Sequence, residues 1–134
     1  MANDWKNAGF GVYVHCPFCA AKCPYCDFNS HVRNAVDQSA WANALVSEIE
    51  HTAAWTPNRT VNTVFFGWGT PSLMLPETVD SILQAIAANW TLSPTAEITL
   101  EANPTSVEAT RFKGFADAGV NRISMGIQDR KSVV

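Results

Sequence analysis

Residues 61–72, VNTVFFGWGTPS, contain the two features that indicate the fold. The first seven, VNTVFFG, are rich in β-branched and aromatic side chains, which is typical of a strand. They run directly into GWGTPS, a turn whose glycines permit sharp bends and close backbone approach. In parallel α/β sheets, the carboxyl ends of the strands carry the functional groups. We therefore interpret this stretch as a strand that ends in a functional turn.

The segments on either side of that strand have the spacing of helices. On the N-terminal side, Ser39 suits a helix cap, and Trp41, Leu45 and Ile49 then recur every four residues. On the C-terminal side, Pro76 suits a first helical turn. Five apolar residues then trace one helix face: Val79, Ile82, Leu83, Ile86 and Trp90.

Three more strands and one more helix complete the pattern. The predicted strands are GVYVH (11–15), EITLEA (97–102) and VNRISMGIQ (120–128). Between the last two, Thr105 and Glu108 form a capping box for a helix that buries Phe112 and Phe115 and ends at Gly119. Strand and helix thus alternate, which predicts an α/β fold with a parallel sheet and right-handed crossovers.

The chain also contains too few strands for a closed structure. Four strands cannot close a barrel, and an open sheet this short would leave a long unprotected edge. We therefore expect the 134 residues to be the N-terminal part of a longer protein. Residues 1–128 would belong to the α/β core, and residues 129–134, DRKSVV, would be a non-native tail.

Composition and charge exclude several classes of protein. The chain is 47% apolar and 16% charged, which is enough apolar material for a core. A net charge of −3 argues against a nucleic-acid partner. The sequence has no membrane-spanning apolar run and no signal peptide, so we expect a cytoplasmic protein that contacts a membrane at most peripherally.

Four cysteines cluster after the first predicted strand, at positions 16, 19, 23 and 26. A reducing compartment disfavours disulfides, and a thioredoxin-like pair at Cys23 and Cys26 would not need Cys19. Structural zinc would need a fourth ligand, for which Cys16 or His31 is available, but zinc ligands usually form two separated pairs. One compact loop of thiolates fits an iron–sulfur cluster best, with zinc as the alternative.

The spacing Cys19-x3-Cys23-x-Tyr25-Cys26 resembles the signature of the radical S-adenosylmethionine superfamily. Residues 13–31, 65–73, 100–104 and 121–128 together resemble its oxygen-independent coproporphyrinogen III oxidase branch. This resemblance implies a partial TIM barrel, here cut after about four strands. It also implies a 4Fe–4S cluster on the three cysteines, with the fourth iron left for S-adenosylmethionine and radical chemistry.

The same resemblance implies further cofactor contacts at the strand ends. The turn Gly67-Trp68-Gly69-Thr70 is similar to a family GGGTP turn, from which Trp68 departs because a glycine is expected there. Either the indole points away and the backbone still serves, or cofactor binding is impaired. The other implied contacts are Tyr13 and Tyr25 in the pocket wall, Glu101 as an acceptor for ribose hydroxyls, and Gln128 at the end of the fourth strand. Cys16 is interpreted as a packing residue, and His15 as a structural histidine.

Phe28 separates two members of this branch. Coproporphyrinogen oxidases carry a cysteine two residues after the last ligand, whereas this chain has Cys26-Asp27-Phe28. CPYCDFNSH resembles haem chaperones of the HemW type, which implies haem binding, an electron donor and a respiratory client protein. The alternatives are a radical decarboxylase of coproporphyrinogen III and, in another class, a small zinc-stabilised module. Whether the chain is an enzyme therefore stays open at this point.

Overall fold

The structure is a computed structural model, and it describes residues 8–16, 18–19, 31–32, 38–103 and 110–126. Its main sheet has the order β1-β4-β5-β6 and is parallel throughout. The four strands are β1 (Gly11–His15), β4 (Thr60–Gly67), β5 (Thr91–Ala102) and β6 (Arg122–Met125). Two short strands, β2 (Phe18–Cys19) and β3 (His31–Val32), pair separately. The predicted parallel α/β fold is confirmed.

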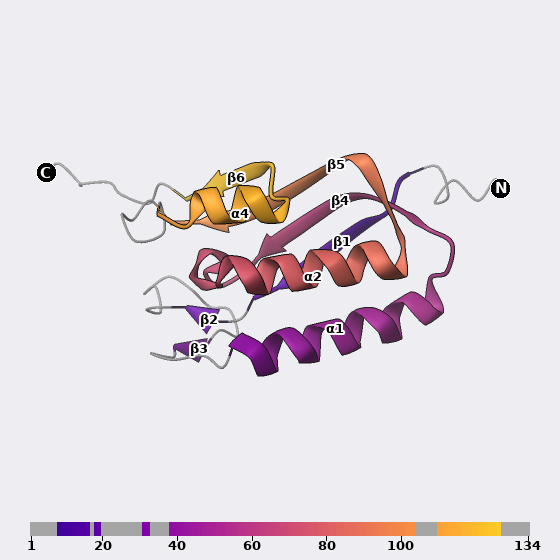
Figure 1. Cartoon of the computed structure of the whole chain (residues 1–134), viewed down its shortest axis with the longest axis horizontal. Helices are drawn as coiled ribbons and strands as arrows, with labels where there is room; N and C mark the ends of the chain where they lie inside the picture. Colours follow the sequence, from indigo (N-terminus) through magenta and orange to yellow (C-terminus); the bar gives the residue numbers. More distant parts are fainter. Residues whose placement is uncertain (1–7, 17, 20–30, 33–37, 104–109, 127–134) are drawn as a thin grey trace, which may run out of the picture.

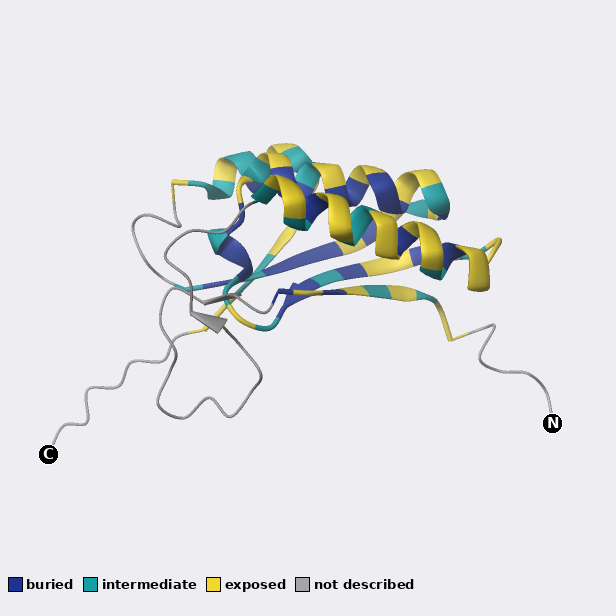
Figure 2. Cartoon of the chain, turned by 90° about the horizontal axis from the view of Figure 1, so that it is seen from below, coloured by how far each residue is buried: buried dark blue, intermediate teal, exposed yellow. Residues whose placement is uncertain are grey.

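Three helices cover one face of the sheet (Figures 1 and 2). They are α1 (Gln38–Trp55), α2 (Pro76–Asn89) and α4 (Phe112–Ala118), and a short 3-10 helix, η2 (Pro71–Leu73), precedes α2. Pro76 occupies the first turn of α2, as predicted. No helix in the described part of the chain is both long and apolar enough to span a bilayer.

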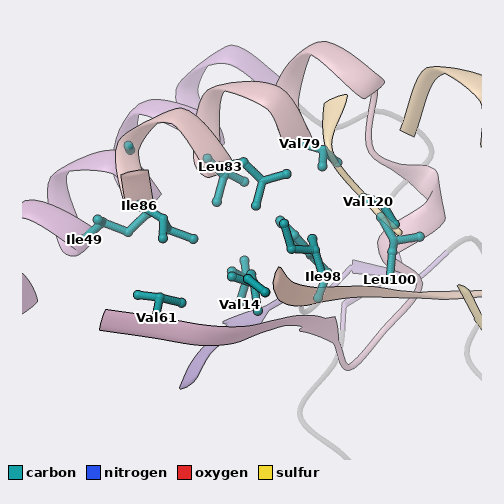
Figure 3. Packing of buried hydrophobic residues seen from close by; sticks show 14 of the residues in the cluster. Val14, Ile49, Val61, Val79, Leu83, Ile86, Ile98, Leu100 and Val120 are labelled. Atoms are coloured by element: carbon teal, nitrogen blue, oxygen red, sulfur yellow. The ribbon is translucent and has the colours of Figure 1, made fainter. Parts of the chain in front are cut away.

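The core lies between the sheet and these helices (Figure 3). Strand side chains alternate between faces, and the register places Val14 beside Phe66 and Phe66 beside Leu100 on the helix side. Phe66 and Leu100 are fully buried. From the helices, Ile82 and Ile86 of α2 are equally inaccessible, and Ile49 joins them from α1.

The opposite face of the sheet, here called the open face, carries no described helix (Figure 2). The strand register aligns Tyr13, Phe65, Thr99 and Arg122 across it. Its members are polar or aromatic, and Tyr13 is 54% exposed. This composition contrasts with the aliphatic core on the helix side, although Thr99, in the middle of the row, is only 1% exposed.

Some boundaries differ from the prediction. The helix that contains Phe112 and Phe115 begins at Phe112, later than predicted, because residues 110–111 form a turn; the predicted capping box of Thr105 and Glu108 is not tested. Residues 104–109 lie outside the described part. Strand β5 begins at Thr91 rather than at residue 97, since its first residues pair with β4 before a register shift between Val61 and Thr63. Helix α1 already includes Ser39, which is therefore not its cap.

Side chains tie the amino-terminal ends of the strands to the helices. The indole Nε1 of Trp90 donates to the Thr56 carbonyl oxygen at 2.9 Å. The ring of Phe10 lies 5.5 Å from that of Trp90, and the Arg59 guanidinium lies 4.7 Å from the Phe10 ring centre. These contacts close the edge of the core where β1 and β4 begin.

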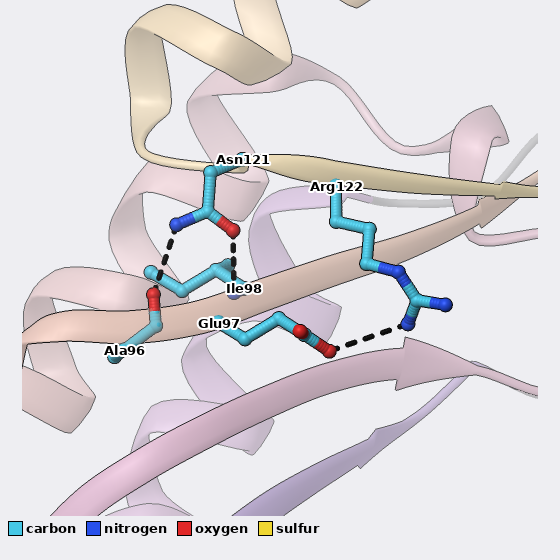
Figure 4. Close-up of polar contacts among 5 residues, drawn as sticks. All are labelled: Ala96, Glu97, Ile98, Asn121 and Arg122. Atoms are coloured by element: carbon cyan, nitrogen blue, oxygen red, sulfur yellow. Dashed lines mark hydrogen bonds and ion pairs between the residues drawn. The ribbon is translucent and has the colours of Figure 1, made fainter.

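The side chain of Asn121, just before β6, links that strand to β5 (Figure 4). Its Nδ2 donates to the Ala96 carbonyl at 2.9 Å, and its Oδ1 accepts from the Ile98 N–H at 2.8 Å. Asn121→Ala leaves both backbone groups without this partner, so we expect the free energy of unfolding to fall by about 1–2 kcal/mol.

Urea denaturation would measure this loss, and Arg122→Ala is the matched control. Arg122 forms an ion pair with Glu97 at 3.2 Å, but both side chains are 56% exposed. We expect that control to cost no more than about 0.5 kcal/mol. Equal losses in the two variants would contradict the assigned role of Asn121.

Candidate functional site

The carboxyl ends of the four main strands meet at one edge, here called the rim. His15 at the end of β1 lies beside Gly67 at the end of β4, and Glu101 of β5 lies beside Ser124 of β6. The residue after β1 is still hydrogen-bonded to β4, because the Cys16 N–H donates to the Gly67 carbonyl at 2.9 Å. The rim thus places the start of the cysteine loop directly against the turn that follows β4.

Glycine is required at the first position of that turn. A Cβ on Gly67 would lie 2.5 Å from the Tyr13 hydroxyl and 2.8 Å from the Phe65 ring. Both distances are too short for a real side chain, so any substitution must displace an aromatic ring. The Tyr13 hydroxyl therefore lies beside the turn, and its place in the wall of a cofactor pocket remains a prediction.

The next two residues adopt left-handed backbone conformations. Trp68 has φ 69° and Gly69 has φ 49°. Glycine tolerates this conformation, whereas for tryptophan it costs about 1 kcal/mol or more. The Trp68 ring is tilted against the His15 ring, with centroids 5.0 Å apart. The indole therefore packs on the end of β1, a contact that the sequence did not predict.

The turn continues into η2 and is fixed there by an arginine. The Leu73 N–H donates to the Thr70 carbonyl at 3.0 Å, which closes the turn. Arg111, just before α4, donates from Nη1 to the Leu73 carbonyl at 2.8 Å and to the Met74 carbonyl at 3.3 Å. Arg111 was not among the predicted site residues, because nothing in the local sequence pattern indicates a contact with a segment 37 residues away.

Glu101 places its carboxylate on the same turn. Its Oε2 accepts a hydrogen bond from the Trp68 N–H at 3.0 Å, although 33 residues separate the two in sequence. The side chain is partly buried. Sequence resemblance predicted a carboxylate here for ribose hydroxyls, and the structure adds a backbone partner within the protein.

The charge of Glu101 affects two neighbouring groups. The pKa of Tyr13 is raised above its ordinary value, mainly by burial and then by the negative charge of Glu101. Tyr13 stacks on Phe65, with ring centroids 5.8 Å apart and an angle of 9° between the planes. A protonated phenol, an aromatic pair and a carboxylate therefore lie together at the rim end of the open face.

Cys16 is a core residue, as predicted. It is 3% exposed, and its Sγ lies 3.7 Å from the Val14 carbonyl. Burial raises the pKa of its thiol far above the usual range, and Glu101 adds to the rise. Because thiolates rather than thiols bind metals, Cys16 is unsuited to be a ligand.

This burial predicts a loss of stability at alkaline pH. Below pH 9.0, the ordinary pKa of the group, the thiol is protonated in both the folded and the unfolded chain. Above that pH the thiol loses its proton only in the unfolded chain. The unfolded state is therefore favoured increasingly as the pH rises, and the stability of the folded chain declines. We expect the free energy of unfolding to fall by about 1.4 kcal/mol per pH unit from this group.

Urea denaturation between pH 8 and 10 would measure the slope for the parent chain and for Cys16→Ala. Tyr13, whose pKa is raised from 10.0, adds a smaller loss only at higher pH, since it is largely exposed. The parent should lose stability faster than the variant above pH 9. Parallel pH profiles would show that the Cys16 thiol titrates normally in the folded state.

The remaining predicted site residues lie outside the described part of the chain. They are Cys23, Tyr25, Cys26 and Gln128. For Cys19 only the backbone is described, at the end of β2, where it pairs with Val32. The structure therefore brings together Tyr13, the 67–70 turn and Glu101, and the cluster ligands remain predictions.

The profile of the Radical SAM superfamily matches residues 13–132. This chain is a member of the radical SAM superfamily. It is 44% identical over 124 residues to the "Heme chaperone HemW" of Escherichia coli, covering 92% of this chain and 33% of the relative. It is 45% identical over 117 residues to the bovine "Radical S-adenosyl methionine domain-containing protein 1, mitochondrial", covering 87% of this chain and 26% of the relative.

A solved radical SAM structure has the same fold. This is the coproporphyrinogen III oxidase (HemN) of Escherichia coli, with a TM-score of 0.81 and 30% identity over 92% of this chain and 29% of that one. The similarity confirms the predicted partial barrel of radical SAM type. The chain spans about a third or less of the lengths of these relatives.

Proposed function

We propose that this chain forms the first part of a radical SAM core that binds a 4Fe–4S cluster through Cys19, Cys23 and Cys26. We further propose that S-adenosylmethionine binds at the rim, against the turn 67–70 and Glu101. When bound, this pair would supply one-electron reduction and radical chemistry. Three clustered thiolates suit such a cluster, since they leave one iron for another ligand.

The described rim residues fit the nucleotide cofactor. Gly67 allows the Tyr13 hydroxyl and the Phe65 ring to lie directly against the turn, so these aromatic groups would border a ligand bound there. The Glu101 carboxylate is partly accessible and suits a hydroxyl donor. The indole of Trp68 packs on His15, so it does not replace the turn backbone that the cofactor would contact. A tryptophan at position 68 is therefore compatible with the proposed cofactor site.

For the whole protein, we propose haem delivery of the HemW kind rather than porphyrinogen decarboxylation. The observation that carries this choice is Phe28, which replaces the extra cysteine expected of an oxidase. The identities favour the same choice, at 44% with a haem chaperone and 30% with an oxidase. An electron donor, a respiratory client protein and a cytoplasmic location remain predictions.

Anaerobic reconstitution of the full-length gene product would test the proposal. Iron, sulfide and zinc analysis comes first, followed by titration with S-adenosylmethionine, titration with haem and a coproporphyrinogen III turnover assay on one preparation. We expect iron and sulfide, haem binding and no turnover. Turnover without haem binding would favour the oxidase, and colourless protein with zinc would favour the zinc-stabilised module.

A further inference from the structure

The turn 67–70 is held on both sides by residues that are distant from it in the sequence. At its start, Gly67 is confined by the Tyr13 hydroxyl from β1 and by the Phe65 ring. Beyond its end, Arg111, the residue before α4, donates to the carbonyls of Leu73 in η2 and of Met74. Between these points the turn contains its two left-handed residues. That middle part is where the backbone most needs an additional constraint.

Glu101 supplies a constraint at that point. Its Oε2 lies 3.0 Å from the Trp68 nitrogen, and the donor belongs to a residue with φ 69°. A hydrogen bond to an ionised carboxylate is about twice as strong as one between neutral groups. Glu101 belongs to β5, which is paired with β4 from Val64 to Phe66, so its backbone is anchored beside the turn.

We propose that Glu101 is a positioning residue, whose carboxylate fixes the Trp68 N–H and thereby sets the conformation of the turn 67–70 before any ligand binds. The bond uses one of the two carboxylate oxygens, so the other remains available to a ligand hydroxyl. One side chain would then both shape the turn and contact the ligand. The inference rests on the proposed function only for the identity of that ligand.

Charge and hydrogen bonding at this position can be separated. The negative charge of Glu101 contributes to the raised pKa of Tyr13. Glu101→Gln removes the charge but keeps an oxygen that accepts from the Trp68 N–H, whereas Glu101→Ala removes both. Glu97 is the matched control, because it lies on the same strand and the same face and bonds Arg122 instead of the turn.

Amide exchange in the 134-residue chain without ligand would test the proposal. Selective ¹⁵N labelling of tryptophan gives five backbone signals, and Trp68→Phe identifies the one of interest. Exchange at Trp68 should accelerate about tenfold or more in Glu101→Ala, but only about threefold in Glu101→Gln. It should stay unchanged in Glu97→Ala. Tyr13 should titrate at lower pH in both Glu101 variants.

The Trp90 amide is the internal reference, because it bonds the Ile86 carbonyl at the end of α2, far from the turn. If Glu101→Ala accelerates both amides through general unfolding, the comparison passes to Glu101→Gln, where Trp68 must still exchange faster relative to Trp90. Unchanged relative exchange at Trp68 in that variant, or in a folded Glu101→Ala, would overturn the proposal. The proposed function fails separately, if the reconstituted full-length gene product does not bind S-adenosylmethionine while the exchange pattern holds.

Discussion

Alanine at Cys19, Cys23 or Cys26 is expected to abolish iron and sulfide binding, whereas Cys16→Ala should retain it. The three predicted ligands each provide a thiolate to the cluster, and the loss of one leaves two irons without a protein ligand. Even outer-shell changes at metal sites lower affinity by about 10–100-fold, so the loss of a direct ligand should exceed that range. Iron and sulfide analysis after anaerobic reconstitution would measure the effect.

Cys16 is a strict control, since it belongs to the same cysteine group but points into the core. It is 3% exposed, and burial keeps its thiol protonated. Its replacement should therefore cost about 1 kcal/mol of stability through lost packing, without loss of iron. Iron retained in Cys19→Ala, or lost in a folded Cys16→Ala, would mean that the ligand set is different.

A large difference in stability is expected between substitutions at two adjacent phenylalanines, which lie on opposite faces of β4. Phe66 is fully buried among the core residues, whereas Phe65 is partly exposed and stacks on Tyr13 on the open face. Phe66→Ala should reduce the free energy of unfolding by about 3–5 kcal/mol, because it leaves a cavity in the core. Phe65→Ala should cost about 1 kcal/mol, mainly the loss of one aromatic pair.

Chemical denaturation of both variants would compare the two faces directly. A loss of 3–5 kcal/mol is a large fraction of the stability of a small domain, so Phe66→Ala could unfold entirely. In that case Phe66→Leu and Phe65→Leu give the same comparison at smaller amplitude. A larger loss at position 65 than at position 66 would show that the open face, rather than the helix face, contains the core.

The sequence predicted the order of the elements because their patterns are local. VNTVFFG and the Pro76 helix have the composition and spacing of their final structures. The last helix begins at Phe112, later than predicted, because residues 110–111 form a turn. The predicted capping box at Thr105 and Glu108 lies outside the described residues. The early start of β5 was missed, since it depends on pairing with β4 across a register shift.

The sequence indicated which residues lie at the candidate site, but it did not indicate which of them contact one another. Resemblance selected Tyr13, the 67–70 turn and Glu101, and the structure brings these together. The bond from Trp68 to Glu101 joins residues 33 positions apart and depends on a left-handed backbone, which no local pattern indicates. The contact of Arg111 with Leu73 was missed for the same reason.

The two ends of the parallel sheet differ in what they contribute. The amino ends are secured by the Phe10–Trp90 contact and by the Asn121 bridge, whereas the carboxyl ends hold the turn 67–70 and Glu101, where we propose that the cofactor binds. Mutations in the first set should change the melting temperature without altering ligand affinity, and many in the second should do the reverse. Residues at the carboxyl ends of the strands can therefore change during evolution, and with them ligand binding, while the contacts at the amino ends preserve the stability of the fold.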